Sequence, residues 1–198
     1  DLNKTIRLGR KLIYAIFFDV SHLRLISMPQ LHLFILSLFM RLLKLDQFRC
    51  RSLTAMEIQL CQSVFGNLID YSQVKVMNHP YLPWQPQHIF MAPCGYIHVR
   101  NRHYLPDYSQ ANRSYQAIFI HEMAHILQHQ HKINVLLHGA VLQTAYFLSF
   151  KRYNPYHYRL IAAKPFFAYN IEQQGEIAKD IFLKKIDNII LNSPHRST

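Results

Sequence analysis

The motif HExxH at residues 121–125 constrains this chain more than any other feature, because its two histidines can act together only on a helix. Histidines at positions i and i+4 stand on one helix face about 6 Å apart, so His121 and His125 can both reach one metal ion. Apolar residues around the motif keep the helical period and predict a helix over residues 114–131. With 13 His and only four Glu in 198 residues, roughly 0.02 such motifs are expected by chance, so the match is informative.

The rest of the chain predicts helices, then a small β-sheet, then helices again. This order is typical of an α+β fold rather than of alternating βαβ units. The helical pattern covers residues 1–50, 53–70, 114–131, 135–150 and a last helix at about 170–187. Strands are predicted at 73–77, 88–92 and 96–100, the last two as a hairpin in which Gly95 supplies any positive φ.

A change in residue composition predicts two parts, an N-terminal segment at residues 1–52 and a main domain at 53–198. The N-terminal segment is apolar, basic and helical in pattern. Its apolar run at 31–40 is shorter than the about 20 residues that a bilayer span needs, so it predicts a buried or docking helix, with membrane-surface association as one role. The main domain would begin with a helix that Thr54 and Glu57 start as a capping box.

The charge balance narrows the classes of partner. Lys and Arg total 22 and Asp and Glu total 11, so the formal net charge is +11. Such a chain is attracted to polyanions such as nucleic acid, anionic lipid or an anionic cell wall, although a basic surface also serves solubility alone. No glycine-rich phosphate-binding loop occurs, and the three cysteines have no metal-like spacing.

The glutamate inside the motif adds a catalytic group to the two metal-binding histidines. Glu122 points to a neighbouring helix face, where it can contact a zinc-bound water without binding the metal itself. Zinc lowers the pKa of such a water, and a carboxylate beside it serves as the general base. The motif therefore predicts a zinc-dependent hydrolase with Zn²⁺ as cofactor, His121 and His125 as ligands, and Glu122 as the catalytic base.

A catalytic zinc site needs a third protein ligand, and the residues leave several candidates open. His131 continues the HExxHxxGxxH spacing of metzincins, although a Gln replaces the Gly and no methionine follows the motif. Glu172 and Glu176 have the gluzincin spacing, in which the first acid binds the metal and the second orients a metal-binding histidine. A swap, with Glu176 as ligand and Asp180 as the orienting acid, fits the spacing almost as well.

Four segments of the chain resemble the metallopeptidase extension of certain VgrG spike proteins, the puncturing tips of bacterial type VI secretion systems. They are SVFGNLIDYSQVKVMNHPYLPWQP, the MAP of residues 91–93, FIHEMAHILQHQ and YNIEQQGEIAKD, and the resemblance spans about residues 53–183. It implies a zincin fold and a glutamate as third ligand, for which Glu172 is our choice. It also implies a toxic effector that acts in the periplasm of a rival bacterium, with the secretion spike and a cognate immunity protein as partners.

Hydrolysis also needs a donor for the developing oxyanion besides the metal. The candidates are His79, His98, His103, Tyr153, Tyr156, His157 and Tyr169, of which we keep Tyr156, His157 and Tyr169 as the principal ones. The strand predicted at 96–100 offers an edge on which a peptide substrate can pair.

We therefore expect a zinc metallopeptidase that cleaves a peptide or protein substrate, secreted as an antibacterial toxin and active in the target periplasm. No nucleic-acid partner is expected for such an enzyme. Two alternatives stay open. One is a hydrolase or amidase that acts on cell-wall stem peptides of peptidoglycan. The other is a non-enzymatic basic protein that binds membranes or nucleic acid, which would hold no stoichiometric metal and would bind in a strongly salt-dependent way.

Overall fold

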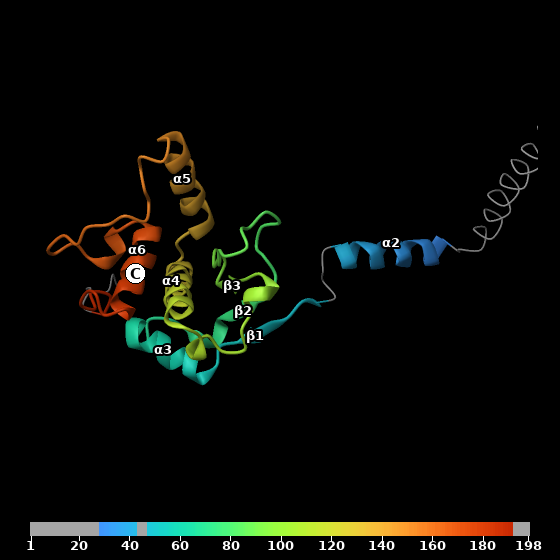
Figure 1. Cartoon of the computed structure of the whole chain (residues 1–198), viewed down its shortest axis with the longest axis horizontal. Coiled ribbons are helices and arrows are strands. Elements are labelled where there is room, and N and C mark those ends of the chain that lie inside the picture. Colours follow the sequence, from blue (N-terminus) through green and yellow to red (C-terminus); the bar gives the residue numbers. More distant parts are fainter. Residues whose placement is uncertain (1–27, 43–46, 192–198) are drawn as a thin grey trace, which may run out of the picture. The chain divides into compact units, whose positions relative to one another are not determined.

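The computed structural model describes residues 28–42 and 47–191, and the chain divides into two units at residues 1–47 and 48–198. In the first unit, α2 (Met28–Leu42) is a helix (Figure 1), and its side chains at 29–42 are exposed. This helix confirms part of the helical pattern predicted over residues 1–50, whereas residues 1–27 and 43–46 lie outside the described part. Within the described ranges, no helix is both long and apolar enough to cross a membrane.

The second unit mixes helices with a small sheet, as the order of the patterns predicts. Its elements are β1 (Cys50–Ser52), α3 (Ala55–Phe65), β2 (Lys75–Met77), β3 (Tyr96–His98), α4 (Arg113–Gln130), α5 (Val135–Leu148) and α6 (Ile171–Phe182), with short 3-10 turns between them. The helices predicted around the HExxH motif and at 135–150 are confirmed. The other two are shorter than predicted, because α3 ends where Gly66 takes a φ of 54° and α6 ends at Phe182.

The sheet has three short strands in the order β1-β2-β3. Strand β1 runs antiparallel to β2, so residues 50–52 belong to the second unit and not, as predicted, to the N-terminal segment. Strand β3 pairs with β2 in parallel. The predicted hairpin is wrong in its first strand, since residues 88–92 contribute only one antiparallel bridge, from Met91 to His98. Pro86 and Pro93 flank that segment and remove backbone donors that a longer ladder would need.

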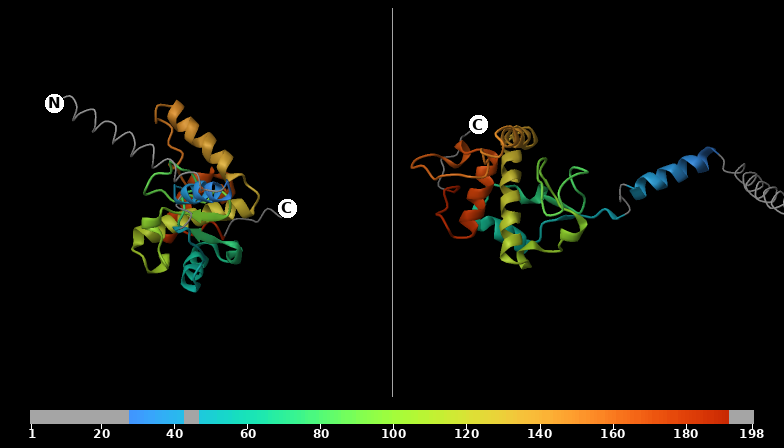
Figure 2. Two further views of the ribbon diagram at one scale, coloured as in Figure 1. Left: turned by 90° about the vertical axis from the view of Figure 1, so that its right-hand side faces the viewer. Right: turned by 45° about the horizontal axis from the view of Figure 1, so that its top comes forward.

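Helix α4 lies between α6 and the sheet and forms the centre of the second unit (Figure 2). Asn112 begins the helix, because its side chain accepts the N–H of Tyr115. From Phe119 to Gln128 every residue of α4 is buried, and α6 packs against it with Ile177 and other apolar side chains. The helix that carries the HExxH motif therefore sits in the rigid core, which holds its histidines in place.

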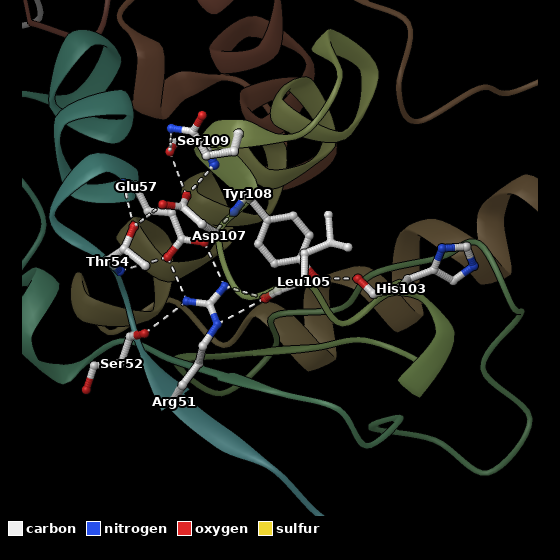
Figure 3. Close-up of polar contacts among 10 residues, drawn as sticks. Arg51, Ser52, Thr54, Glu57, His103, Leu105, Asp107, Tyr108 and Ser109 are labelled. Carbon is white, nitrogen blue, oxygen red and sulfur yellow. Dashed lines mark hydrogen bonds and ion pairs between the residues drawn. The ribbon is translucent and has the colours of Figure 1, made fainter.

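A buried carboxylate joins β1, α3 and the turn that follows Pro106 (Figure 3). Glu57 accepts two hydrogen bonds of 2.7 Å from Arg51 and two more from the backbone N–H groups of Thr54 and Tyr108. The bond from Thr54 completes the predicted capping box, which is confirmed. A buried charge paired in this way supports the fold, because removing its partner would leave it unpaired in the interior.

Candidate metal centre

Two histidines of α4 and one glutamate of α6 bring three ligand atoms together. Nε2 of His121 lies 3.4 Å, and Nε2 of His125 lies 3.7 Å, from Oε2 of Glu172, and the three atoms lie within 4.8 Å of one another. Both separations exceed the about 2.7–3.2 Å of a good N–H···O hydrogen bond. A tetrahedral zinc ion with bonds of about 2.1 Å separates its ligand atoms by about 3.4 Å. The two separations from Glu172 are thus close to those between ligands of one small ion.

Helix α6 begins at the point that presents Glu172 to this site. Asn170 caps the helix, since its side chain accepts the N–H of Gln173 while the Gln173 side chain accepts the N–H of Asn170. Glu172 therefore falls in the first turn, and Glu176 follows one turn later on the same helix face.

The second acid of α6 orients the first histidine. Nδ1 of His121 lies 3.2 Å from Oε1 of Glu176, whose other oxygen pairs with Lys179. A carboxylate on one ring nitrogen leaves the opposite nitrogen to face a metal. The swapped arrangement lacks this geometry, because Asp180 accepts a hydrogen bond from Tyr158 and pairs with Lys185. Between the two open alternatives on α6, the contacts favour Glu172 as ligand and Glu176 as the orienting acid.

The second histidine is oriented by a residue that the sequence analysis did not select. Nδ1 of His125 lies 2.9 Å from Oε1 of Gln128, which is fully buried. The amide nitrogen of Gln128 donates to the carbonyl oxygen of Ile171 and to Oε1 of Gln174, so its oxygen must be the group that faces the ring. Nδ1 of His125 is then the protonated nitrogen, and Nε2 keeps a lone pair for a metal.

A glycine lets α6 approach His121 this closely. A Cβ atom at Gly175 would lie 2.5 Å from Cε1 and 2.6 Å from Nε2 of the His121 ring, much closer than two such atoms can come. Gly175 stands between Glu172 and Glu176 on α6. Because glycine has no side chain, the imidazole of His121 can occupy the space where a Cβ would otherwise lie. Nothing within α6 itself indicates a role for this glycine, because the atoms that require it belong to α4.

The glutamate of the motif, Glu122, lies beside this cluster without joining it. Glu122 is buried, and among the described residues its Oε2 has no hydrogen-bond partner. Buried polar atoms without a partner are rare and often belong to functional groups. This oxygen is therefore available to a water molecule or a substrate that enters the site.

The electrostatics of the cluster favour positive charge. Burial lowers the pKa of His121, but its contacts with Glu172 and Glu176 outweigh burial and raise that pKa to about 10. Burial opposes the charge of Glu172 too, yet the two histidines hold the pKa of this carboxyl far below its usual range. Burial raises the pKa of Glu122, against the pull of both histidines. A proton and a metal ion would therefore compete for the same imidazoles.

The cluster opens into a cleft of about 790 Å³, lined by His121, Glu122, His125 and Glu172 among others. One wall is α5, which contributes Leu136, Ala140 and Phe147, and the other is the loop at 82–93, which contributes Trp84 and Ile89. Most of the lining is apolar, and a few polar groups gather at the cluster. Ligand sites of proteins typically combine these two features at this size.

The remaining predicted site residues lie at different distances from this cleft. Tyr156 lines it, with its ring centroid 6.3 Å from that of His121. Tyr169 is buried instead, and its hydroxyl accepts the N–H of Ile161 and donates to the carbonyl oxygen of Arg159. His157 is exposed and does not line the cleft. His131 caps the end of α4 and packs its ring 5.0 Å from that of Phe167.

The other candidates for an oxyanion donor lie outside the cleft lining as well. His79 contacts the carbonyl oxygen of Pro80, and His98 contacts that of His79. His103 contacts the hydroxyl of Tyr115, and Tyr153 is exposed. Of all the donors that the sequence offered, Tyr156 is the one that the structure brings to the cleft.

Removing the amide that orients His125 is expected to weaken metal binding. We expect Gln128→Ala to lower zinc affinity by about 10–100-fold, as loss of an orienting partner typically does. Competition with a chelator of known affinity measures the change. A Gln128→Ala variant with unchanged affinity would show that packing alone holds the ring.

The fold and the site together define an α+β domain with an HExxH helix and an acidic candidate ligand on the neighbouring helix. No protein-family profile matches the chain. The chain is 45% identical over 136 residues to the type VI secretion system spike protein VgrG2b of Pseudomonas aeruginosa, a match that covers 68% of this chain and 13% of that protein. The solved effector domain of Pseudomonas aeruginosa VgrG2b is 42% identical with a TM-score of 0.63, over 71% of this chain and 78% of that one. The chain therefore belongs to the family of the VgrG2b effector domain.

This membership confirms the predicted kinship with VgrG proteins and the α+β class of the fold. The chain spans only 13% of the length of the spike protein that it matches. The zincin-like topology, the metal and the peptidase activity stay predictions.

Proposed function

We propose that this chain is a zinc-dependent peptide-bond hydrolase, with His121, His125 and Glu172 as metal ligands and Glu122 as general base. The observation that supports it most is the convergence of Nε2, Nε2 and Oε2 at separations of 3.4 and 3.7 Å. Two imidazoles and one carboxylate are also ligands that zinc prefers. The partners on both Nδ1 atoms, Glu176 and Gln128, leave the Nε2 atoms to the metal.

In this proposal, Glu122, Tyr156 and the apolar walls of the cleft each have a separate task. Zinc held by such ligands acts as a Lewis acid and lowers the pKa of water to about 7. Oε2 of Glu122 takes a proton from the attacking water and passes it to the leaving amine. The Tyr156 hydroxyl donates to the oxygen of the scissile carbonyl as charge develops there. The apolar walls bind the side chains of the peptide and exclude bulk water.

We further propose the biological role of a secreted effector. The matched solved structure is the effector domain of a spike protein of a type VI secretion system. By extension, this chain would associate with a secretion spike and be countered in its producer by an immunity protein. Hydrolysis of protein inside the producer would be self-damaging, so the periplasm of a target bacterium is the proposed site of action. A net charge of +11 would hold the protein near the anionic wall there.

Metal analysis of the purified full chain tests the proposal most directly. We expect one zinc per chain, and loss of that zinc in Glu172→Ala, because a ligand is removed. Hydrolysis of an unfolded protein substrate should stop with chelation and return with added zinc. A folded protein prepared without chelator that holds less than about a tenth of an equivalent of zinc would contradict the proposal, given the tight affinity of such sites. Release of stem peptides from purified sacculi, without cleavage of protein, would favour the cell-wall alternative.

A further inference from the structure

Helix α5 carries apolar residues on two sides, and the cleft uses only one of them. Leu136 and Phe147 belong to the side that lines the cleft. Leu137, Val141 and Leu148 follow one another at i, i+4 and i+11 on an adjacent side, about 100° round the helix from Leu136, where they are 58%, 60% and 75% exposed. A helix that is apolar all round is normally buried. Within the second unit, none of residues 48–191 covers this side.

The exposed side of α5 continues into further apolar residues. Phe150, just beyond the helix, is 89% exposed. Across the cleft mouth stands Trp84, which is 75% exposed and also lines the cleft. Helix α5 and the loop between β2 and β3 both rise toward the top of Figure 1. We call Leu137, Val141, Leu148 and Phe150, together with Trp84 on the opposite wall of the cleft, the docking face, since exposed apolar residues around a cleft mark sites of association.

The charged side chains on α5 and in the segments directly before and after it are all of one sign. No aspartate or glutamate occurs between Glu122 and Glu172, a stretch that contains the whole of α5 and the loop after it. The same stretch has exposed basic side chains at both ends of α5 and beyond it, namely Lys132, Lys151, Arg152 and Arg159. An apolar face with basic flanks complements a surface that is apolar beneath and anionic on top, which is the chemistry of an acidic lipid bilayer.

The dimensions of α5 decide how it could meet a bilayer. Its 14 residues extend about 21 Å at 1.5 Å per residue, less than the about 30 Å of a hydrocarbon core. The helix can therefore lie in the headgroup region, but it is too short to cross the hydrocarbon core. Tryptophan is enriched at this depth, because its ring is apolar and its N–H stays near water.

We propose that the docking face binds the surface of an anionic lipid bilayer, with α5 in the headgroup region and the mouth of the cleft toward the lipid. The substrates within reach would then be polypeptide segments that lie close to a membrane. A second copy of this chain fits the face less well, because the basic flanks of two such surfaces repel each other. This inference concerns binding alone and does not depend on zinc or hydrolysis.

Vesicle binding by the full chain tests the proposal, and the single tryptophan of the sequence, Trp84, is the probe. Vesicles of phosphatidylethanolamine and phosphatidylglycerol should bind the protein, shift the Trp84 emission to shorter wavelength and allow its quenching by brominated lipid. Vesicles of phosphatidylcholine alone should bind at least ten-fold more weakly, and added salt should weaken the binding to the anionic vesicles. Glu122→Gln should bind as the wild type does.

A matched pair of variants distinguishes the contribution of α5 to vesicle binding from that of α2, the other exposed apolar helix. The triple variant Leu137→Gln, Val141→Gln, Leu148→Gln should lower vesicle binding at least ten-fold while its circular dichroism stays unchanged. The corresponding variant on α2, Leu33→Gln, Leu36→Gln, Leu38→Gln, should leave the Trp84 quenching in place.

Three results would overturn the proposal. They are full binding by the α5 variant, binding that leaves the Trp84 emission unchanged, and no binding of the wild type to anionic vesicles. If the wild type instead forms a dimer in sedimentation experiments that the α5 variant abolishes, the docking face belongs to a second copy. If it binds an acidic protein but no vesicle, the face belongs to a protein partner.

Discussion

Replacing Glu122 with glutamine is expected to lower peptide hydrolysis by about 10²–10⁴-fold, the usual contribution of a general base. The amide has nearly the same shape as the carboxylate, and the change removes no hydrogen bond at Oε2 of Glu122, because this atom has no partner among the described residues. Zinc content should stay at one per chain, because Glu122 is not one of the three converging ligands. Single-turnover hydrolysis together with metal analysis measures both quantities on one preparation.

The same variant separates catalysis from damage caused by positive charge alone. Glu122→Gln raises the formal net charge only from +11 to +12, so attraction to an anionic envelope is nearly unchanged. We expect wild-type protein directed to the bacterial periplasm to be toxic, the variant to be harmless, and cytoplasmic expression to be much less toxic. Equal toxicity of both proteins in the periplasm would contradict the hydrolase. Toxicity confined to the cytoplasm would keep the enzyme and contradict its location.

Gly175→Ala is expected to disrupt the metal centre through a single methyl group. The new Cβ would lie 2.5 Å from the His121 ring, so either the imidazole or α6 must move. Both movements separate His121 from Glu172, and we expect zinc content to fall below about a tenth of an equivalent. Overpacking of this kind costs about 1–3 kcal/mol of the free energy of unfolding. Metal analysis and urea denaturation of the chelator-treated protein measure the two effects.

A second helical glycine provides the matched control for this clash. Gly139 lies within α5, and its added Cβ would meet only Cδ1 of Ile171, at the ordinary contact distance of 3.8 Å. Helix propensity favours alanine over glycine by about 1 kcal/mol at both positions. Gly139→Ala should therefore keep its zinc and be no less stable than the wild type. Full zinc content in Gly175→Ala would show that α6 can shift without loss of the site.

The candidate site was predicted from the sequence in those parts that lie within one helix. His121, Glu122 and His125 belong to one turn of α4, so their spacing alone places them together. The acidic pair of α6 was recognised in the same way, by its spacing of four residues. Tyr169 shows where this method stops, because nothing near it in the chain indicates that its hydroxyl would bond to the loop at 159–161.

What the sequence by itself determined is local. The helix of the HExxH motif, the capping boxes at Thr54 and Asn170 and the α+β order depend on side chains only a few residues apart, and such interactions can be recognised from spacing. In both boxes the capping residue and its partner are three positions apart, Thr54 with Glu57 and Asn170 with Gln173.

The tertiary structure decided everything that depends on two distant segments meeting. It paired β3 in parallel with β2, placed Gln128 against His125 while bonding it to Ile171, and set Gly175 against the His121 ring. A glycine inside a helix and a glutamine inside a motif look unremarkable until the facing helix is in place. Packing between α4 and α6 is a property of both surfaces at once, and neither segment alone carries the information about which atoms will touch.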